Sequence, residues 1–224
     1  KLPKFCGRTL VMRAAEEPLQ VNEAAAAYGR KAVLYATCFS NYNNPEIGMA
    51  ARRVLAHNGV ATEVVYPRCC GMPQFERGDI ARVAEHAKTV SEALAPYIDE
   101  GYDVMVVTGD RDLFQLIEPG VRVMATSRGI TETKVYDRDA VIDRYGIAPE
   151  LIPDFIGLKG DTSDNIPGVP GIGDKTASEL LQRFGDLETV LASVDEISGA
   201  KRKQNLTEHA DDARLSKQLA TIVY

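Results

Sequence analysis

The chain has 224 residues, of which 45% are hydrophobic and 26% charged, so it is long and apolar enough to form a folded core. Its formal net charge of −6 argues against a generic nucleic-acid binder. No run of eighteen apolar residues and no apolar secretory segment occurs, which predicts a cytoplasmic protein without a membrane span.

The first half predicts an α/β arrangement that follows a polar, loosely held arm over residues 1–28. The apolar run at 31–37 predicts a buried strand, and the run at 61–67 predicts a second strand. Between them we expect a helix that begins near Pro45 and ends at Asn58-Gly59. The apolar face predicted for this helix consists of Ile47, Ala50, Ala51, Val54 and Leu55.

Residues 78–101 predict one or two helices, and the apolar run at 102–110 predicts a third strand of the central, parallel kind. Two short strands around a turn at Arg128-Gly129 follow. The remaining chain predicts mostly helices, with no further strand–helix–strand repeat. They are expected at 137–146, with a stop at Gly146, and at 149–160, 174–184 and 186–193.

Four aspartates are candidate metal ligands: Asp110, Asp112, Asp161 and Asp164. Asp110 and Asp112 are two apart at the end of a strand, which in extended chain puts both on one face. Asp161 and Asp164 are three apart, which on a helical turn does the same. Carboxylate oxygens are the ligands that Mg²⁺ and Mn²⁺ prefer, and a bound cation would remove their repulsion. The alternative is that they serve as caps and turn residues.

A glycine-punctuated turn lies between 166 and 174, in the stretch "GVPGIGDKTASELL". Its spacing is Gly-x-x-Gly-x-Gly without a preceding strand, which is not a dinucleotide fingerprint. A helix that starts at Asp174, with Ala177, Leu180, Leu181 and Phe184 on its buried face, offers free N–H groups to a phosphate. We expect a helix–hairpin–helix element that holds a nucleic-acid backbone; the alternative is a tight turn between packed helices. The residues expected to contact DNA are Gly168, Val169, Gly171, Ile172, Gly173, Lys175 and Thr176.

The stretches "VMVVTGDRDLFQLIEPG" and "GDTSDNIPGVPGIGDKTASELL" resemble the 5′–3′ exonuclease domain of bacterial DNA polymerase I, and the resemblance covers residues 104–224. It implies that Asp110, Asp112, Asp161 and Asp164 are catalytic and hold Mg²⁺ or Mn²⁺. It also implies a helix–three-turn–helix with K⁺ at the turn, and duplex or 5′-flap DNA as the substrate in replication and repair. The polymerase portion of a longer chain is an expected partner.

The same family has further aspartates, a basic arch and an acidic run before this strand, and residues 1–103 contain none of them. Asp99-Glu100 is a close acidic pair in this region, but it lies at a helix end. The resemblance therefore implies a nuclease with half of its metal-binding carboxylates missing. We expect duplex binding with little or no turnover.

Residues 1–103 carry a different resemblance. The stretch "YATCFSNYNNPEIG", with Cys38, and the triplet Cys69-Cys70-Gly71 resemble the cysteine-rich CCG domain found in the iron–sulfur component of anaerobic glycerol-3-phosphate dehydrogenase and in heterodisulfide-reductase-like proteins. This implies that Cys38, Cys69 and Cys70 are ligands of an iron–sulfur cluster. Another cysteine is expected where Thr108-Gly109-Asp110 stand, and Cys6 lies too far upstream to replace it. The alternative is small buried thiols.

The two resemblances predict a chimeric chain, joined near residues 101–104, that is a piece of a longer protein. Its expected fold class is α/β, with a partial parallel-sheet half over 1–103 and a partial, mostly helical 5′-nuclease half over 104–224. The leading prediction is a 5′–3′ exonuclease-type protein. The competing one is an iron–sulfur redox subunit whose partners are other subunits of a redox complex.

Overall fold

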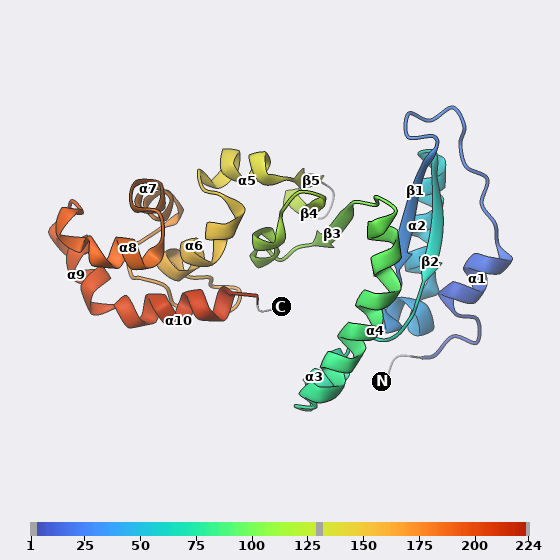
Figure 1. Ribbon diagram of the computed structural model, residues 1–224, viewed down its shortest axis with the longest axis horizontal. Coiled ribbons are helices and arrows are strands. Elements are labelled where there is room, and N and C mark those ends of the chain that lie inside the picture. The colour runs from blue at the N-terminus through green and yellow to red at the C-terminus, as the bar shows by residue number, and fades with distance from the viewer. Residues whose placement is uncertain (1–3, 129–131, 223–224) are drawn as a thin grey trace. The chain divides into compact units, whose positions relative to one another are not determined.

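The computed structural model describes residues 4–128 and 132–222 (Figure 1). The chain divides into two compact units, Lys1–Tyr102 and Asp103–Tyr224, called here the N-terminal and C-terminal units. Both contain helices and strands, so the expected mixed α/β class is confirmed. Whether each unit is a partial domain stays a prediction. Within the described residues, every helix is too short or too polar to span a membrane.

The N-terminal unit is built on two parallel strands, β1 (Arg30–Tyr35) and β2 (Val60–Val65). The helix α2 (Pro45–His57) joins them, and its end at Gly59, with a φ of 89°, is the stop that the sequence predicts. Both strands are confirmed, but most of their residues are half-buried or exposed rather than buried. This fits a sheet of two strands, which has no central position.

The buried face of α2 differs from the predicted one. Ile47 and Val54 are more than half exposed, and Ala50 is exposed as well. The face that is buried consists of Pro45, Gly48, Met49, Arg52 and Ala56. The rule that apolar residues mark the inner face fails here because a glycine and an arginine occupy inner positions.

The predicted loose arm over residues 1–28 is wrong, because it contains the helix α1 (Leu10–Glu16). The hydroxyl of Thr9 accepts the N–H of Met12 and caps the helix. Leu10 is 2% exposed and lies against Gly48, where an added Cβ would come within 2.1 Å of the leucine side chain. The missing side chain on α2 thus makes room for α1.

The remaining helical segments of this unit include a π-helix at Phe39–Asn43, α3 (Met72–Phe75) and α4 (Ile80–Asp99). The carboxylate of Asp79 accepts the N–H of Arg82 and starts α4. The segment 78–101, predicted as one or two helices, is therefore one long helix that retains Pro96 in its last turn.

The C-terminal unit begins with a three-stranded sheet in the order β3 (Val104–Thr108), β4 (Val121–Arg128), β5 (Glu132–Tyr136). The first pair is parallel and connected through a 3₁₀ helix, η2 (Asp112–Leu116), whereas the second pair is antiparallel. The third strand is thus confirmed, but it is an edge strand and not a central one. Val107 is 72% exposed. Of the turn predicted at Arg128-Gly129, Arg128 is the last residue of β4, and Gly129 lies outside the described residues.

Helices make up the rest of this unit, and the predicted stop at Gly146, with a φ of 69°, is confirmed. So is the buried face of α7: Ala177, Leu180 and Leu181 are buried, and Phe184 packs against the same core. The helical segments are α5 (Arg138–Tyr145), η3 (Pro149–Leu151), α6 (Ile152–Lys159), α7 (Asp174–Phe184), α8 (Leu187–Ala192), η4 (Val194–Glu196), α9 (Ala200–Glu208) and α10 (Ala210–Ala220).

The helix α6 lies at the centre of the C-terminal core, and its residues 152–158 are all buried. Buried Asp154 accepts from Lys217 of α10 at 2.7 Å and from the N–H of Leu187 at 2.8 Å, so its charge is paired. A Cβ at Gly157 would approach the carbonyl of Ala213 to 3.0 Å. These contacts fix the end of α6, from which the candidate site extends.

Candidate metal centre and nucleic-acid interface

Three carboxylates of the C-terminal unit come together. Oxygen atoms of Asp110, Asp112 and Asp164 all lie within 4.8 Å of one another. In residues 4–128 and 132–222, this is the one group of three or more Asp, Glu, His or Cys side chains with that geometry. The structure thus joins the end of β3 to the loop after α6.

Asp110 and Asp112 meet for a different reason from the one predicted. The strand β3 ends at Thr108, and Asp112 is the first residue of η2, so the two do not share a face of extended chain. Instead, the Thr108 hydroxyl accepts the N–H of Asp110 at 3.0 Å, and the Asp110 carboxylate accepts the N–H of Asp112 at 3.0 Å. Asp110 therefore serves as a turn residue, as the alternative prediction has it, and also belongs to the group of three carboxylates.

The helical turn predicted for Asp161 and Asp164 is also wrong. Asp161 and Ile166 exchange two backbone hydrogen bonds of 2.9 and 2.7 Å around a tight loop, in which Asn165 has a φ of 57°. The Asp161 carboxylate accepts the N–H of Ser163 at 2.8 Å and its hydroxyl. The Ser163 hydroxyl is the main cause that lowers the pKa of Asp161. Asp161 therefore has partners of its own, and it is Asp164 that joins the cluster.

Asp112 is the carboxylate most affected by this arrangement. Burial raises its pKa to about 6, and the charges of Asp110, Asp164 and Asp161 act in the same direction. Its Oδ1 atom is buried and has no hydrogen-bond partner. An all-oxygen set with an unpartnered buried ligand atom fits a hard divalent cation, which would supply both the missing partner and the opposite charge.

The glycine turn that follows is used largely for packing. Gly168 has a φ of 62°, and a Cβ there would come within 2.2 Å of the backbone nitrogen of Gly160. Val169 and Ile172 are buried in the core. The N–H groups of Gly168, Val169 and Ile172 are already donated, to the Ser216 hydroxyl, the Leu158 carbonyl and the Val169 carbonyl. These three residues, expected to contact DNA, therefore cannot offer their N–H groups to a phosphate.

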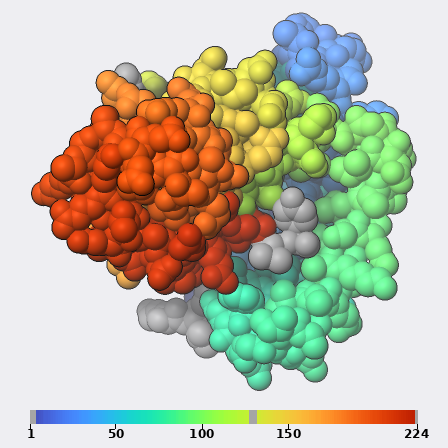
Figure 2. Space-filling model, turned by 60° about the vertical axis from the view of Figure 1, so that its left-hand side comes forward, coloured from blue at the N-terminus to red at the C-terminus, as the bar shows by residue number. Residues whose placement is uncertain are grey.

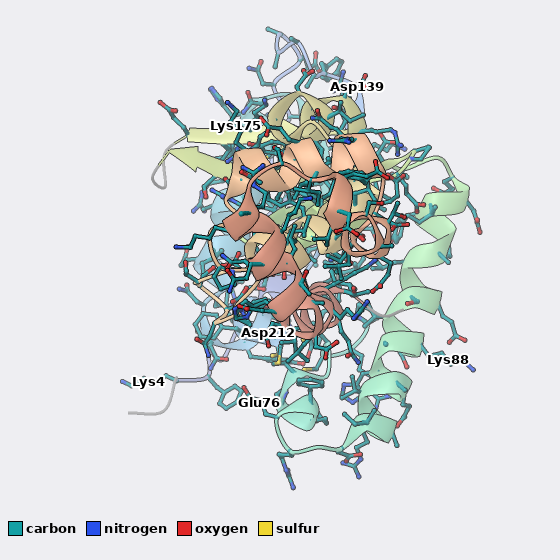
Figure 3. The ribbon with its side chains drawn as sticks, turned by 90° about the vertical axis from the view of Figure 1, so that its left-hand side faces the viewer. Lys4, Glu76, Lys88, Asp139, Lys175 and Asp212 are labelled. Atoms are coloured by element: carbon teal, nitrogen blue, oxygen red, sulfur yellow. The ribbon has the colours of Figure 1, made fainter. Side chains whose placement is uncertain are left out.

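The amino end of α7 remains available. The N–H groups of Asp174, Lys175 and Thr176 are in the first turn and have no intrahelical acceptor, and Gly173 has no side chain to cap them. The Lys175 side chain is 91% exposed and extends from the surface of the unit (Figure 3). Together with Gly171 and Gly173, which are exposed, these residues form the accessible part of the predicted DNA contact. In the space-filling view, the residues after this helix start, coloured orange to red, form one continuous surface (Figure 2).

Lys159 connects the two parts of the site, and sequence reasoning missed it. Its ammonium lies 3.3 Å from the Asp174 carboxylate at the start of α7. Its charge opposes the rise that burial causes in the pKa of Asp112, and it adds to the lowering of the pKa of Asp161, of which the Ser163 hydroxyl is the main cause. Its position directly before Gly160-Asp161 was the available signal. A second missed residue is Asn205 of α9, whose amide donates to the Pro170 carbonyl at 2.6 Å and holds the glycine turn.

The cysteines of the N-terminal unit lie partly together. Burial raises the pKa of the Cys38 thiol, and the neighbouring thiols of Cys69 and Cys70 raise it further. The Nδ1 atom of the His86 ring lies 2.9 Å from the carbonyl oxygen of Cys69. Cys6 is exposed and donates to the Asn43 carbonyl at 3.4 Å. All four are free thiols, and the three predicted ligands do not form a compact ligand set in the described residues.

Comparisons with known proteins match two separate parts of the chain. Residues 147–224 match the family model described as 5′-3′ exonuclease, C-terminal SAM fold. Residues 32–110 match the cysteine-rich domain family. The second match runs past the predicted junction at 101–104 and ends at Asp110.

Among curated proteins, DNA polymerase I of Bacillus caldotenax is 56% identical over 123 residues, which are 55% of this chain and 14% of that protein. DNA polymerase I of Bacillus subtilis (strain 168) is 44% identical over 152 residues, which are 68% of this chain and 16% of that protein. The chain thus spans about a seventh of the length of these relatives.

Among solved structures, a mutant T5 5′-exonuclease has a TM-score of 0.52 at 18% identity, with 85% of this chain and 87% of that chain covered. The T5 D15 protein co-crystallised with metal ions also has a TM-score of 0.52, at 12% identity, over 85% and 89% of the two chains. Identities this low are evidence of a common fold alone. The C-terminal part of the chain is therefore similar to 5′–3′ exonucleases, and residues 32–110 are similar to a cysteine-rich domain.

Proposed function

We propose that the C-terminal unit is a 5′-nuclease-type element that binds a divalent metal and the backbone of duplex or 5′-flap DNA. The observation that carries this proposal is the group of Asp110, Asp112 and Asp164, linked through Lys159 to the open amino end of α7. A carboxylate cluster beside free N–H groups suits a phosphodiester, which needs both a cation and hydrogen-bond donors. The similarity to 5′–3′ exonucleases and to DNA polymerase I supports the same function.

The residues have distinct roles in this proposal. Asp110, Asp112 and Asp164 would hold Mg²⁺ or Mn²⁺, which when bound activates water and stabilises the leaving oxygen of a phosphodiester. The N–H groups at the start of α7 would bind one backbone phosphate, and Lys175 would add a point charge. Asp161 is a positioning residue, because its carboxylate holds the loop that carries Asp164. A K⁺ ion at the glycine turn, as the family resemblance implies, stays a prediction.

We further propose that this chain by itself turns over little substrate. Two-metal hydrolysis needs a second cation about 3.5–4 Å from the first. The carboxylate group found in residues 4–128 and 132–222 offers three close ligands, which suits one cation. The loss of one preorganised charge-stabilising group commonly lowers the catalytic rate by a factor on the order of 10²–10³, so a site without the second cation should be slow.

Binding and cleavage of a labelled 5′-flap duplex in Mg²⁺ or Mn²⁺ test both statements. Salt-sensitive binding without efficient cleavage is expected. Asp112→Asn combined with Asp164→Asn should weaken Mn²⁺ binding at least tenfold, whereas Asp143→Asn, an exposed aspartate on α5 in the same unit, should not. Robust cleavage that the double substitution abolishes would contradict the incomplete site. Equal Mn²⁺ binding by both variants would contradict the metal assignment itself.

A second candidate function is an iron–sulfur redox subunit. The match of residues 32–110 to a cysteine-rich domain and the neighbouring positions of Cys38, Cys69 and Cys70 favour it. Cys38, Cys69 and Cys70 would be the ligands, with the fourth position external. Anaerobic reconstitution followed by iron and sulfide analysis tests this, beside a variant in which the three cysteines are serine. Stoichiometric, air-stable iron and sulfide that depend on these cysteines would favour the redox function over the nuclease.

The origin of the chain from two proteins is a separate proposal. Two family models match separate residues, and the chain divides into units between Tyr102 and Asp103, close to the predicted junction. Sequencing of the genomic DNA across codons 95–110 tests it. A single uninterrupted reading frame there would establish the fused polypeptide, whereas two separate frames would show an assembly artefact.

A further inference from the structure

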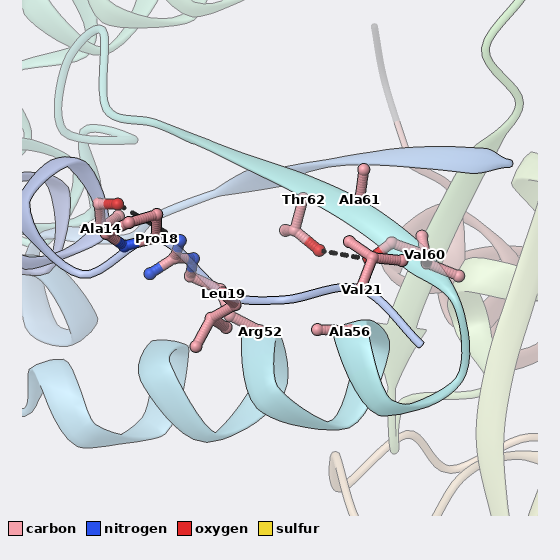
Figure 4. Close-up of a pocket in the computed structure, with 9 residues that line it drawn as sticks. All are labelled: Ala14, Pro18, Leu19, Val21, Arg52, Ala56, Val60, Ala61 and Thr62. Atoms are coloured by element: carbon pink, nitrogen blue, oxygen red, sulfur yellow. Dashed lines mark hydrogen bonds between the residues drawn. The ribbon is translucent and has the colours of Figure 1, made fainter. Parts of the chain in front are cut away.

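A cavity of about 260 Å³ lies in the N-terminal unit, between the chain that follows α1, the helix α2 and the beginning of β2 (Figure 4). Seven of the nine described residues that line it are aliphatic, and the set includes one charged side chain and no carboxylate. The lining consists of Ala14, Pro18, Leu19, Val21, Arg52, Ala56, Val60, Ala61 and Thr62.

The charged residue in this wall is Arg52, which is only 5% exposed. Its Nη2 donates to the Ala14 carbonyl at 3.2 Å (Figure 4). Its Nη1 donates to the Glu17 carbonyl at 3.3 Å. Its Nε is buried and has no hydrogen-bond partner. Nη1 also lies 3.5 Å from the Sδ atom of Met49, and the Nε atom is too buried for a molecule in the cavity to reach. What the cavity offers to an anion is therefore the uncompensated positive charge of the guanidinium.

No carboxylate of the described residues forms an ion pair with Arg52. The nearby carboxylates of Glu17 and Glu46 instead pair with Arg13, at 3.3 and 2.5 Å. The carbonyl groups at the end of α1 favour a cation there, but they do not neutralise it. A buried charge without a counter-ion is unfavourable, so an anion that enters the cavity would relieve a cost already present in the fold.

The wall and the volume restrict the anion. A carboxylate is the anion that pairs best with a guanidinium, so it is the group best suited to supply the missing counter-charge. A volume of 260 Å³ equals the share of roughly eight or nine water molecules at about 30 Å³ each. The aliphatic wall favours a hydrocarbon chain over a polar one.

We propose that this cavity binds a small aliphatic monocarboxylate of about eight non-hydrogen atoms. Its carboxylate pairs with Arg52, and its chain contacts Leu19, Val21 and Ala56. The site uses none of the carboxylates of the C-terminal unit and none of the cysteines, so it is independent of the proposed nuclease and redox functions.

Titration of the 224-residue chain with hexanoate, followed by calorimetry or NMR, tests the proposal. Saturable binding at one site is expected, with hexanol at least tenfold weaker because it lacks the charge. Arg52→Met, which keeps an apolar side chain of similar length, should weaken hexanoate at least tenfold. Arg82→Met is the matched control, because this exposed arginine lies on α4 of the same unit and lines neither this cavity nor the hollow that adjoins it. It should bind hexanoate as the parent does.

Arg52 also holds the carbonyls of Ala14 and Glu17, so a second variant leaves it in place. Ala56→Leu puts a larger side chain into the cavity and should abolish hexanoate binding while the far-UV circular dichroism is retained. The proposal is overturned if the parent chain shows no saturable hexanoate binding, or if Arg52→Met or Ala56→Leu folds and binds as the parent does. Acetate bound as tightly as hexanoate would also overturn it, because the aliphatic wall would then contribute nothing.

Discussion

Asp112 is a carboxyl group held where ionisation is unfavourable. Burial is the main cause that raises its pKa to about 6, and three neighbouring aspartates add to it. In the unfolded chain an aspartate has a pKa of about 3.9, so the folded state binds this proton more tightly. The resulting contribution to the free energy of unfolding is fully present below about pH 4. It is lost as the pH rises through about 6.

We therefore expect Asp112→Asn to stabilise the metal-free protein at pH 7.5 and to have a smaller effect at pH 4.5. Partial exposure of the site screens the repulsion, so the gain at pH 7.5 should stay within about 1 kcal/mol. Denaturant unfolding at the two pH values, with EDTA present, measures it. Asp143→Asn should show no such pH dependence. A loss of stability at pH 7.5 in the Asp112 variant would contradict the raised pKa.

Addition of Mn²⁺ should reverse the order of the two proteins. A ligand that binds only the folded state stabilises it by mass action, by about 2.7 kcal/mol at one hundred times its dissociation constant. The parent chain has three carboxylates to hold the ion, whereas Asp112→Asn has two. We expect Mn²⁺ to raise the melting temperature of the parent clearly more than that of the variant. An equal rise in both would show that the ion binds elsewhere.

At the scale of elements, the loop between α6 and α7 is fixed by close backbone contact. Gly168 combines a φ of 62° with a Cβ position 2.2 Å from the backbone of Gly160, which no rotamer change relieves. Gly168→Ala should destabilise the protein by about 2 kcal/mol or more, the size expected of an overpacked core. Gly173→Ala is the control, because its Cβ would meet nothing within 4 Å. Equal stability of both variants in urea would contradict the tight packing.

The amino end of α7 makes a prediction about DNA. Lys175→Ala should weaken duplex binding similarly for all sequences and should reduce the slope of log affinity against log salt by about one. Lys88→Ala is the matched control, since both lysines are exposed on helices and pair with a glutamate four residues later. Fluorescence anisotropy over a salt series measures both slopes. A Lys175 variant that binds as the parent does would show that this helix end is not the contact.

At the scale of the whole molecule, the two units differ in the size of their cores. The buried core of the N-terminal unit is a small cluster of Leu10, Ala36 and Met49, with Val64 and Tyr66 packed against it. The core of the C-terminal unit is much larger and extends from Phe114 on η2 to Ala220 on α10. Because burial of apolar surface is the main stabilising contribution, the two units should open with different free energies.

Hydrogen exchange read by mass spectrometry should therefore show faster exchange in β1 and β2 than in α6 and α10. Mn²⁺ should slow exchange in the C-terminal unit only, because the carboxylate group lies entirely within it. Hexanoate should act in the opposite way and slow exchange only in the N-terminal unit. One common exchange rate for all of these elements, or protection of both units by Mn²⁺, would contradict their independence.

The sequence by itself determined the elements whose signals are local. The stop at Gly146, the start of α7 at Asp174 and its buried face are set by backbone freedom and by periodicity, which act within a few residues. The identity of the candidate ligands was local too, because Asp110, Asp112 and Asp164 were recognised from the types of side chain that hard cations prefer.

Only the tertiary structure decided how these residues meet. The reasons given for the two aspartate pairs were wrong, since Asp112 opens a 3₁₀ helix and Asp164 lies on a tight loop. The prediction of the inner face of α2 was wrong because Gly48 accommodates Leu10, which belongs to a helix that local propensity did not predict. Lys159 and Arg52 acquire their interest from what surrounds them: the one lies between the carboxylates and α7, and the other is buried without a counter-ion. Such environments depend on contacts between distant segments, which no window of sequence contains.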